Sequence, residues 1–223
     1  MIHALETGDL HEARKRIGLV VGREVQLLDD NGVSRAAVET LAENFVDGFL
    51  SPLFWYLAGG LLAGVIGLPL VITAVSLMLV FKAGSTLDSM VGYRSPEFVA
   101  FGWASAKLDD MMNLIPARVS LIIFFFGAWI SGLHPLNGLR AARRDRLKHD
   151  SPNAGHAESF FAGTLGVRLC GPAVYDGRRK DKPWLGNGNS DPGPEDIRRA
   201  ILLTTYSGWI AVLSSVSGLV VLG

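Results

Sequence analysis

Two long apolar runs limit the fold of this chain more than any other feature. The first, Leu53–Phe81, has 29 residues without a charge, and the second, Ile201–Leu222, has 22. About 20 apolar residues suffice for a helix to cross a bilayer. Backbone amides in hydrocarbon must find partners within their own segment, which favours helices over irregular structure. The runs therefore predict an all-α fold: a polytopic integral membrane protein in a lipid bilayer, whose polar loops carry the motifs.

A third run, Val119–Leu133, is less decisive because it has only 15 residues. It reaches 20 if the helix begins at Leu114 and Arg118 extends its charge towards the lipid headgroups. A buried or re-entrant helix is the alternative for this run.

The overall charge and the cysteine content exclude several classes of protein. The 21 basic and 21 acidic residues cancel, so the chain lacks the net basic field that binds a phosphate backbone, and we expect no nucleic-acid partner. The single cysteine, Cys170, cannot form an internal disulfide, and a buried, inert thiol is the simplest interpretation. The charged first fifty residues do not resemble a signal peptide.

Basic residues are concentrated in one polar segment. Lys and Arg number 12 against 8 Asp and Glu in residues 134–200, but 5 against 9 in residues 1–52. Five of the twelve follow the third apolar run closely: Arg140, Arg143, Arg144, Arg146 and Lys148. By the positive-inside rule, residues 134–200 are expected to face the cytoplasm of a multi-pass protein in the cell (inner) membrane.

The polar N-terminal part is expected to contain two helices. The stretch "GDLHEARKRIGLVVGR" predicts a capped helix that ends near Gly22. An Asp-Asn-Gly turn and a second helix follow, with Ser34 as its N-cap. That helix carries Arg35, Glu39, Glu43 and Asp47 at successive i, i+4 steps, so all four share one face that leads into the first apolar run.

The stretch "SAKLDDMMNLIPAR" places polar residues directly before the third apolar run. If residues 104–115 are helical, Asp109 lies one turn from Asn113, and Asp110 can share the same face. Pro116 is expected to end or kink this helix. These oxygen ligands suit Mg²⁺, and Arg118 suits a phosphate or carboxylate. The alternative is an interfacial cap with an ion pair between Lys107 and Asp110.

The remaining polar segments include loop material and one candidate for anion binding. Residues 175–197 form a polar, Gly/Pro-rich excursion without periodicity, and the sequence shows neither a nucleotide loop nor Cys/His metal spacing. Ser151, Asn153 and Gly155 precede a helix start, where hydroxyl, amide and backbone donors favour an anion. An N-cap by Ser151 or Asn153 alone is the alternative. A single loop histidine such as His156 is more often solvated than a base.

Four stretches in order resemble the cobalamin-biosynthesis family CobD/CbiB, adenosylcobinamide-phosphate synthase. They are "VGREVQLLDDNGVSRAAVETLAENFVDGFLSPLF", "STLDSMVGY", "FGWASAKLDDMMNLIPAR" and "HDSPNAGHAESFFAGTLGVRLCGP". The resemblance covers essentially the whole chain, as a single domain over residues 1–223. It implies a membrane ligase that joins adenosylcobyric acid to an amino-alcohol phosphate such as aminopropanol phosphate, with ATP and Mg²⁺. The chain also resembles a member that lacks the family's N-terminal membrane helices.

The resemblance and the residue chemistry together suggest roles. An acyl phosphate made from ATP would activate the corrinoid carboxylate, and this step needs metal and cations near the phosphates. The candidate residues are Glu43, Asp47, Asp88 and Asp110 for catalysis, Asp109, Asp110 and Asn113 for the metal, and Lys82, Arg94, Arg118, Ser151, Asn153 and Gly155 for the phosphates. Association with other corrin-pathway enzymes is a further expectation. A non-enzymatic membrane regulator or transporter component on the same scaffold is the alternative.

These assignments conflict with the simplest topology. If Leu53–Phe81 and Val119–Leu133 each cross once, residues 82–118 and 134–200 lie on opposite sides of the membrane. Gly64, Gly67 and Pro69 divide the first run, which allows a broken helix or a re-entrant hairpin. Alternatively the third run does not span, or a pocket at membrane depth receives both loops.

Overall fold

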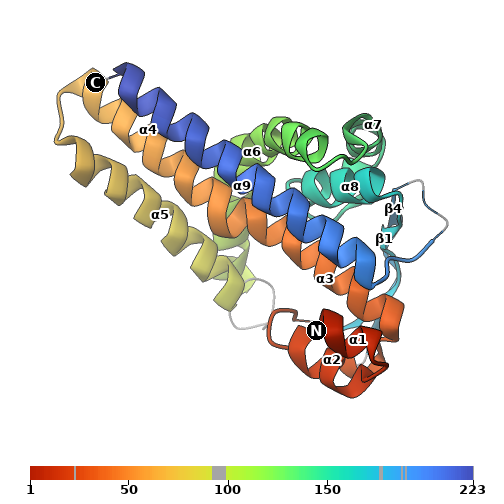
Figure 1. Cartoon of the computed structure of the whole chain (residues 1–223). Helices are drawn as coiled ribbons and strands as arrows, with labels where there is room; N and C mark the ends of the chain where they lie inside the picture. The colour runs from red at the N-terminus through yellow and green to blue at the C-terminus, as the bar shows by residue number, and fades with distance from the viewer. Residues whose placement is uncertain (23, 92–98, 176–177, 187, 189, 223) are drawn as a thin grey trace.

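The computed structural model describes every residue except 23, 92–98, 176–177, 187, 189 and 223. The described part is almost entirely helical (Figure 1). The helices are α1 (Ile2–Glu6), α2 (Leu10–Ile17), α3 (Asp30–Asn44), α4 (Ser51–Ile66), α5 (Leu70–Val91), α6 (Val99–Ile130), α7 (Pro135–Asp145), α8 (Ala154–Leu165) and α9 (Pro194–Leu222), with 3-10 turns at Val25–Leu27 and Arg146–Lys148 and a π-helix at Phe45–Leu50. The strands are β1 (Leu169–Cys170), β2 (Ala173–Tyr175), β3 (Arg178–Lys180) and β4 (Trp184–Leu185).

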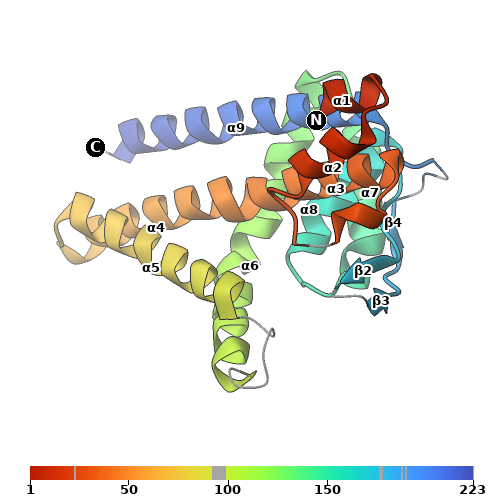
Figure 2. The same ribbon diagram turned by 90° about the horizontal axis from the view of Figure 1, so that it is seen from below.

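The elements form a compact body with long helices that leave it. Helices α1, α2, α7 and α8 and the short strands make the body, whereas α4, α5 and α9 extend away from it (Figure 2). Helix α6 crosses between the two parts. The apolar turn between α4 and α5 and the C-terminal end of α9 lie far from this body (Figure 2).

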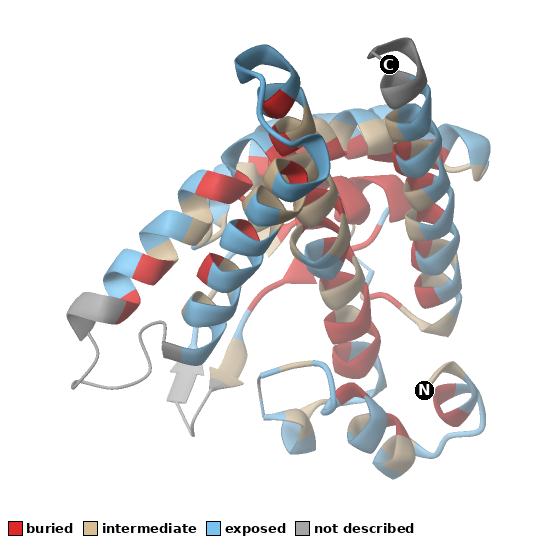
Figure 3. Cartoon of the chain, turned by 90° about the vertical axis from the view of Figure 1, so that its left-hand side faces the viewer, coloured by how far each residue is buried: buried red, intermediate tan, exposed pale blue. Residues whose placement is uncertain are grey.

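Four helical segments are long and apolar enough to cross a membrane. They are Asp30–Ile66, Leu70–Met90, Gly102–Ile130 and Pro194–Ser217. The α4–α5 pair is mostly exposed or half-buried (Figure 3), and its exposed side chains are large and apolar. Such a surface is stable in lipid rather than in water. The structure therefore confirms the expected all-α membrane protein.

The 29-residue apolar run folds into a hairpin instead of one straight span. Helix α4 ends at Gly67, whose φ of +73° is left-handed and favours glycine, and α5 begins just after Pro69. At Gly59 the helices are so close that an added Cβ would lie 2.7 Å from the Cα of Ala74. Of the alternatives for this run, the hairpin is the one adopted, and the chain returns to its starting side (Figure 2).

Helices α3 and α4 are continuous through the π-helix, over the 37 residues Asp30–Ile66. A helix of that size is roughly 55 Å long, well beyond the ~30 Å of bilayer hydrocarbon. Its polar half therefore stands outside the apolar layer, and Asp47 lies at the junction, inside the wider π turn. Such π segments often occur at functional sites.

Two predicted helix boundaries were wrong. Helix α3 is capped by Asp29, whose carboxylate accepts the Gly32 N–H at 2.7 Å, while Ser34 is buried inside the helix and donates to the Asp30 carbonyl. An aspartate that precedes the Asp-Asn-Gly sequence can bond the N–H three residues on, so these residues form the first turn. The preceding helix, α2, ends at Ile17 and not near Gly22.

Pro116 does not end its helix, since α6 runs unbroken over 32 residues. A proline inside a helix leaves the carbonyl four residues earlier without its N–H donor. Here that carbonyl belongs to Met112, and it accepts the indole N–H of Trp55 from α4 at 3.1 Å. The replacement donor explains why the helix continues.

One side of the third apolar run is packed inside the protein. In the most apolar window of α6, 44% is buried, against 17–22% in the other three segments. Phe124 is fully buried, with ring centroids 4.9 Å from Phe45 and 5.0 Å from Phe161. At Gly127 an added Cβ would lie 2.2 Å from the hydroxyl of Ser207, so α6 and α9 pack closely through small residues. One side of the run thus packs in the core, while Ile122, Trp129 and Ile130 remain exposed, so the run also stays a candidate span.

The Gly/Pro-rich excursion contains regular structure that its composition did not predict. Strand β4 pairs antiparallel with β1, and β3 pairs with β2. The guanidinium groups of Arg35 and Arg168 pack against the ring of Trp184, 4.8 and 4.4 Å from its centroid, and Asp191 accepts two hydrogen bonds from Arg168. These long-range contacts fix a segment that has no local pattern.

The hairpin contact makes a matched pair of glycine substitutions informative. Gly59→Ala should force α4 and α5 apart and cost about 1–3 kcal/mol, as overpacking typically does. Gly60→Ala should be neutral or slightly stabilising, because a Cβ there meets nothing within 4 Å and alanine favours helix. Thermal unfolding of the two purified variants in detergent measures the difference. Equal melting temperatures would contradict the close helix contact.

Candidate active site

A cavity of about 520 Å³ opens where the N-terminal end of the hairpin meets the body. Helix α3 with its π turn, α5, α6 and the loop before α8 all contribute to it. Its lining residues are Glu43, Asp47, Ser85, Asp88, Ser89, Ala106, Lys107, Asp109, Asp110, Asp150, Ser151 and Pro152. Because six of them carry carboxylates, we call it the carboxylate cavity.

The carboxylate cavity gathers five of the predicted acids from three distant parts of the sequence. Glu43 and Asp47 come from the first long helix, Asp88 from α5, and Asp109 and Asp110 from α6. Two lysines are close to these acids: Lys107 lies in the lining and Lys82 interacts with Asp47. Asp150 forms an ion pair with Lys180, and the other five carboxylates outnumber these two lysines, so the cavity attracts positive charge.

Asn113, which was expected to bind the metal, lies outside the lining of the carboxylate cavity. It is 1% exposed, its Nδ2 donates to Asp109 Oδ2 at 3.0 Å, and its Oδ1 accepts from the hydroxyl of Ser51 at 2.6 Å. The amide thus orients Asp109 and ties α6 to α4, and it does not line the cavity. We interpret it as a positioning residue.

Asp109 retains one acceptor for a further ligand. Its Oδ1 is buried and has no hydrogen-bond donor of good geometry, although Ser85 lies nearby. A buried carboxylate oxygen without a donor is costly unless something else binds it. With Asp110 beside it, the donor set consists only of oxygens, as Mg²⁺ prefers. The residues present therefore fit a magnesium ion.

The loop before α8 supports the cavity wall by capping the helix. Ser151 Oγ accepts the N–H groups of Asn153 and Ala154 at 3.3 and 3.2 Å, so these donors are already occupied. Asn153 donates to the backbone carbonyl of Asp110 at 2.8 Å. At Gly155 an added Cβ would lie 2.2 Å from the carbonyl oxygen of Arg146. Asn153 is the N-cap residue of α8 but makes no side-chain capping bond; the Ser151 hydroxyl accepts the first N–H of the helix instead, and Asn153 links the loop to α6.

The remaining predicted residues are not gathered at the cavity. Arg118 donates to the Leu114 carbonyl of its own helix and is exposed outside the lining. Arg94 lies outside the described residues. His156 is buried in α8, not solvated as expected; burial lowers its pKa to about 4, with help from Arg118 and Arg146, so the ring is neutral.

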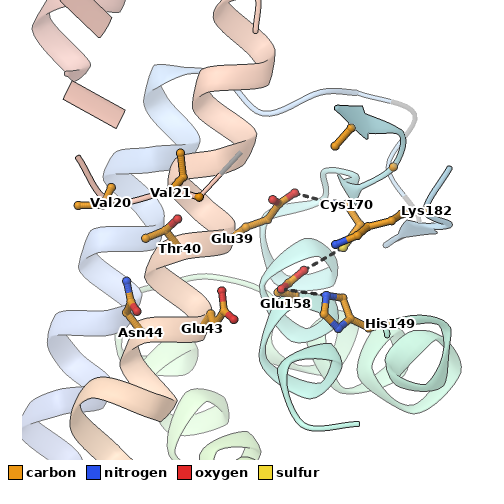
Figure 4. A pocket seen from close by; sticks show the side chains of 13 residues that line it. Val20, Val21, Glu39, Thr40, Glu43, Asn44, His149, Glu158, Cys170 and Lys182 are labelled. Carbon is orange, nitrogen blue, oxygen red and sulfur yellow. Dashed lines mark hydrogen bonds and ion pairs between the residues drawn. The ribbon is translucent and has the colours of Figure 1, made fainter. Parts of the chain in front are cut away.

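A second cavity, of about 310 Å³, was not predicted from the sequence (Figure 4). Glu39 and Glu43 of α3 point towards Glu158 of α8, and His149, Cys170 and Lys182 complete its polar wall. We call it the glutamate cavity. Glu43 lines both cavities, so the two are neighbours. The i, i+4 spacing of Glu39 and Glu43 indicated one wall, but no local pattern links the other four residues.

Burial controls protonation in the glutamate cavity. It raises the pKa of Glu158 well above its ordinary value, and the nearby Glu39 and Glu43 raise it further. Burial also raises the pKa of the Cys170 thiol and lowers that of His149. In the absence of a bound cation, the thiol is therefore protonated and the imidazole neutral.

The comparisons with known proteins now decide the family. A family model described as "CobD/Cbib protein" matches residues 1–204. The chain belongs to the CobD/CbiB family. It is 40% identical over 201 residues to "Cobalamin biosynthesis protein CobD" of Desulfotalea psychrophila, covering 89% of this chain and 61% of that protein. The proteins of the same name from Yersinia enterocolitica and Rhodobacter capsulatus are 39% and 42% identical, over 94% and 96% of this chain.

This CobD/CbiB chain spans less than two thirds of the relatives it matches, 62% of the Yersinia protein and 65% of the Rhodobacter protein. No solved structure matches it. The names of these relatives assign those proteins to cobalamin biosynthesis. The carboxylate cavity is the candidate functional site of this chain.

One further carboxylate anchors the body of this CobD/CbiB protein. Asp145 is fully buried, forms ion pairs with Arg144 and Lys148, and accepts the Gly186 N–H at 2.9 Å. Burial alone would raise its pKa, but the hydrogen bonds from Arg144, Lys148 and Gly186 outweigh it and lower the pKa from 3.8 to about 2. A lowered pKa stabilises the fold above pH 4, and this contribution is lost as the pH falls towards 2.

Asp145→Asn should therefore lower the free energy of unfolding by about 2 kcal/mol at neutral pH, the usual range for bonds to a charged group. The variant should also lose less stability than the parent protein between pH 4 and 2. Circular dichroism melts in detergent at several pH values measure both effects. Glu195→Gln is the control, because Glu195 is 76% exposed in its ion pair with Arg198. If the two variants melt alike, Asp145 is not an anchor.

Proposed function

We propose that the complete protein containing this chain is an adenosylcobinamide-phosphate synthase. It would form an amide between a carboxylate of adenosylcobyric acid and the amine of an amino-alcohol phosphate, with ATP as cosubstrate. The observation that carries the proposal is the carboxylate cavity, where five acids chosen from the sequence for this chemistry line one space. Membership of a cobalamin-biosynthesis family supports the corrinoid substrate.

The reaction divides into two transfers. The corrinoid carboxylate oxygen first forms a bond to the γ-phosphorus of ATP, and ADP leaves, giving an acyl phosphate. The amine nitrogen then bonds to the acyl carbon, inorganic phosphate leaves, and the amine gives up its protons. A catalyst for this sequence must bind a cation near phosphates, hold an ammonium group, and accept a proton.

The cavity residues divide naturally between these tasks. Asp109 and Asp110 would hold Mg²⁺, which neutralises phosphate charge when bound. Glu43, Asp47 and Asp88 line the same cavity, where their charges would attract the substrate ammonium and one of them would accept its proton. Lys82 and Lys107 supply positive charge for the transferred phosphate. Asn113 keeps Asp109 in position through the hydrogen bond described above.

If Asp110 binds magnesium, a conservative substitution of this residue should greatly reduce turnover. Asp110→Asn keeps size and polarity but removes charge, so turnover in the complete protein should fall about 10²-fold or more. Partial recovery at raised Mg²⁺ is expected, and Glu195→Gln, at an exposed position, should keep normal turnover. Formation of cobinamide phosphate by correctly inserted protein is the measurement. Near-normal turnover of Asp109→Asn and Asp110→Asn would mean that these acids are only an interfacial cap.

The alternative of a non-enzymatic regulator on the same scaffold gives a different genetic result. A complete gene that encodes a synthase should restore cobinamide-phosphate formation in a strain that lacks this step. A regulator would not, even when it is stably inserted in the membrane.

The proposed location is the cell membrane, with residues 134–200 in the cytoplasm. Cys170 is a poor label for this topology because it is only 8% exposed. Ser190 is exposed, and Ser190→Cys in a Cys170→Ser background is the better reporter. A membrane-impermeant maleimide should label Cys at 190 only after the cells are opened. Labelling in intact cells would reverse the proposed orientation.

A further inference from the structure

The glutamate cavity has the charge and shape of a cation site distinct from the carboxylate cavity. Three carboxylates, from Glu39, Glu43 and Glu158, face a space of about 310 Å³ that also contains the Lys182 ammonium. When all three acids are ionised, as they would be around a bound cation, Lys182 offsets only part of their negative charge. Confining like charges away from water is unfavourable unless a cation or protons compensate. A divalent cation would balance this excess.

The ligand atoms needed for such an ion converge on one wall of the cavity. One nitrogen of His149, one carboxylate oxygen of Glu158 and the sulfur of Cys170 all lie within 4.8 Å of one another. His149 Nε2 is 3.5 Å from Glu158 Oε1, and Cys170 Sγ is 2.9 Å from Glu158 Oε2. Ligands of a tetrahedral zinc ion are roughly 3.4–3.6 Å apart. Small side-chain movements would bring this set to that spacing.

The backbone holds the sulfur in place. Cys170 has φ +60°, a left-handed conformation, and it is the only described residue other than glycine with a positive φ. Its N–H donates to Glu39 Oε1 at 2.7 Å, which fixes the backbone so that the thiol points at Glu158. A non-glycine residue in this conformation is maintained only where surrounding contacts determine it. The ligand positions thus come from three separate elements: α8, β1 and the loop that follows the 3-10 turn Arg146–Lys148.

We propose that His149, Glu158 and Cys170 bind a thiophilic divalent cation of the Zn²⁺ type, with its fourth position open to the glutamate cavity. Sulfur and imidazole ligands select such ions, whereas the oxygen-only set of the carboxylate cavity suits Mg²⁺. The open position would hold water or a small anionic ligand. This proposal does not depend on the proposed reaction, since it concerns other ligands and another class of metal.

The test uses the purified chain in detergent and Co²⁺ as a spectroscopic substitute for Zn²⁺. One Co²⁺ per chain should bind with a thiolate-to-metal charge-transfer band, and Zn²⁺ should displace it. Cys170→Ser should abolish the band, and His149→Gln and Glu158→Gln should each weaken affinity about 10²-fold or more, beyond the 10–100-fold of outer-shell changes. Asp110→Asn, in the carboxylate cavity, should retain both the band and the affinity.

The parent protein alone can overturn the proposal, whether or not the variants fold. If it binds no Co²⁺, or binds it without a thiolate band, Cys170 is not a ligand. If the band persists at full affinity in His149→Gln and Glu158→Gln, the assigned ligand set is wrong. Loss of the band in Asp110→Asn would mean that the two cavities form one site.

Discussion

The close contact between α4 and α5 is the constraint on which the rest of the structure depends. Its glycine lets the two backbones touch, so the longest apolar run turns back instead of crossing once. Asp88 is thereby returned to the side of the molecule that holds Asp47. A straight span would have separated the two carboxylates by the thickness of the bilayer.

Gathering these carboxylates around one cavity costs electrostatic free energy. Six acids around one cavity repel each other and require cations or protons, and the nearby lysines balance only part of the charge. This uncompensated negative charge favours the binding of cationic ligands. The proposed metal, ammonium and proton roles all draw on that same electrostatic field.

The membrane helices and most acids of the carboxylate cavity were predictable from the sequence, because the patterns that indicate them are local. Charge-free length indicated the membrane helices, and i, i+4 spacing linked Asp109 to Asn113, which the structure joins by a hydrogen bond. The predicted helix end at Pro116 was wrong, because a tertiary hydrogen bond from the indole of Trp55 replaced the lost backbone donor. The grouping of His149 and Glu158 with Cys170 depends on a left-handed backbone and on long-range packing, which no spacing rule encodes.

The central claim is that residues 82–118 and 134–200 meet on one side of the membrane. Ser89 and Pro152 are exposed and line the same cavity, and each belongs to one of these segments. With Cys170 replaced by serine, cysteines at positions 89 and 152 should be joined by a short bifunctional maleimide in native membranes. A pair at 89 and 190 should not react, because Ser190 lies outside the cavity. Failure of the 89–152 pair, with both cysteines labelled only from opposite faces, would contradict the account.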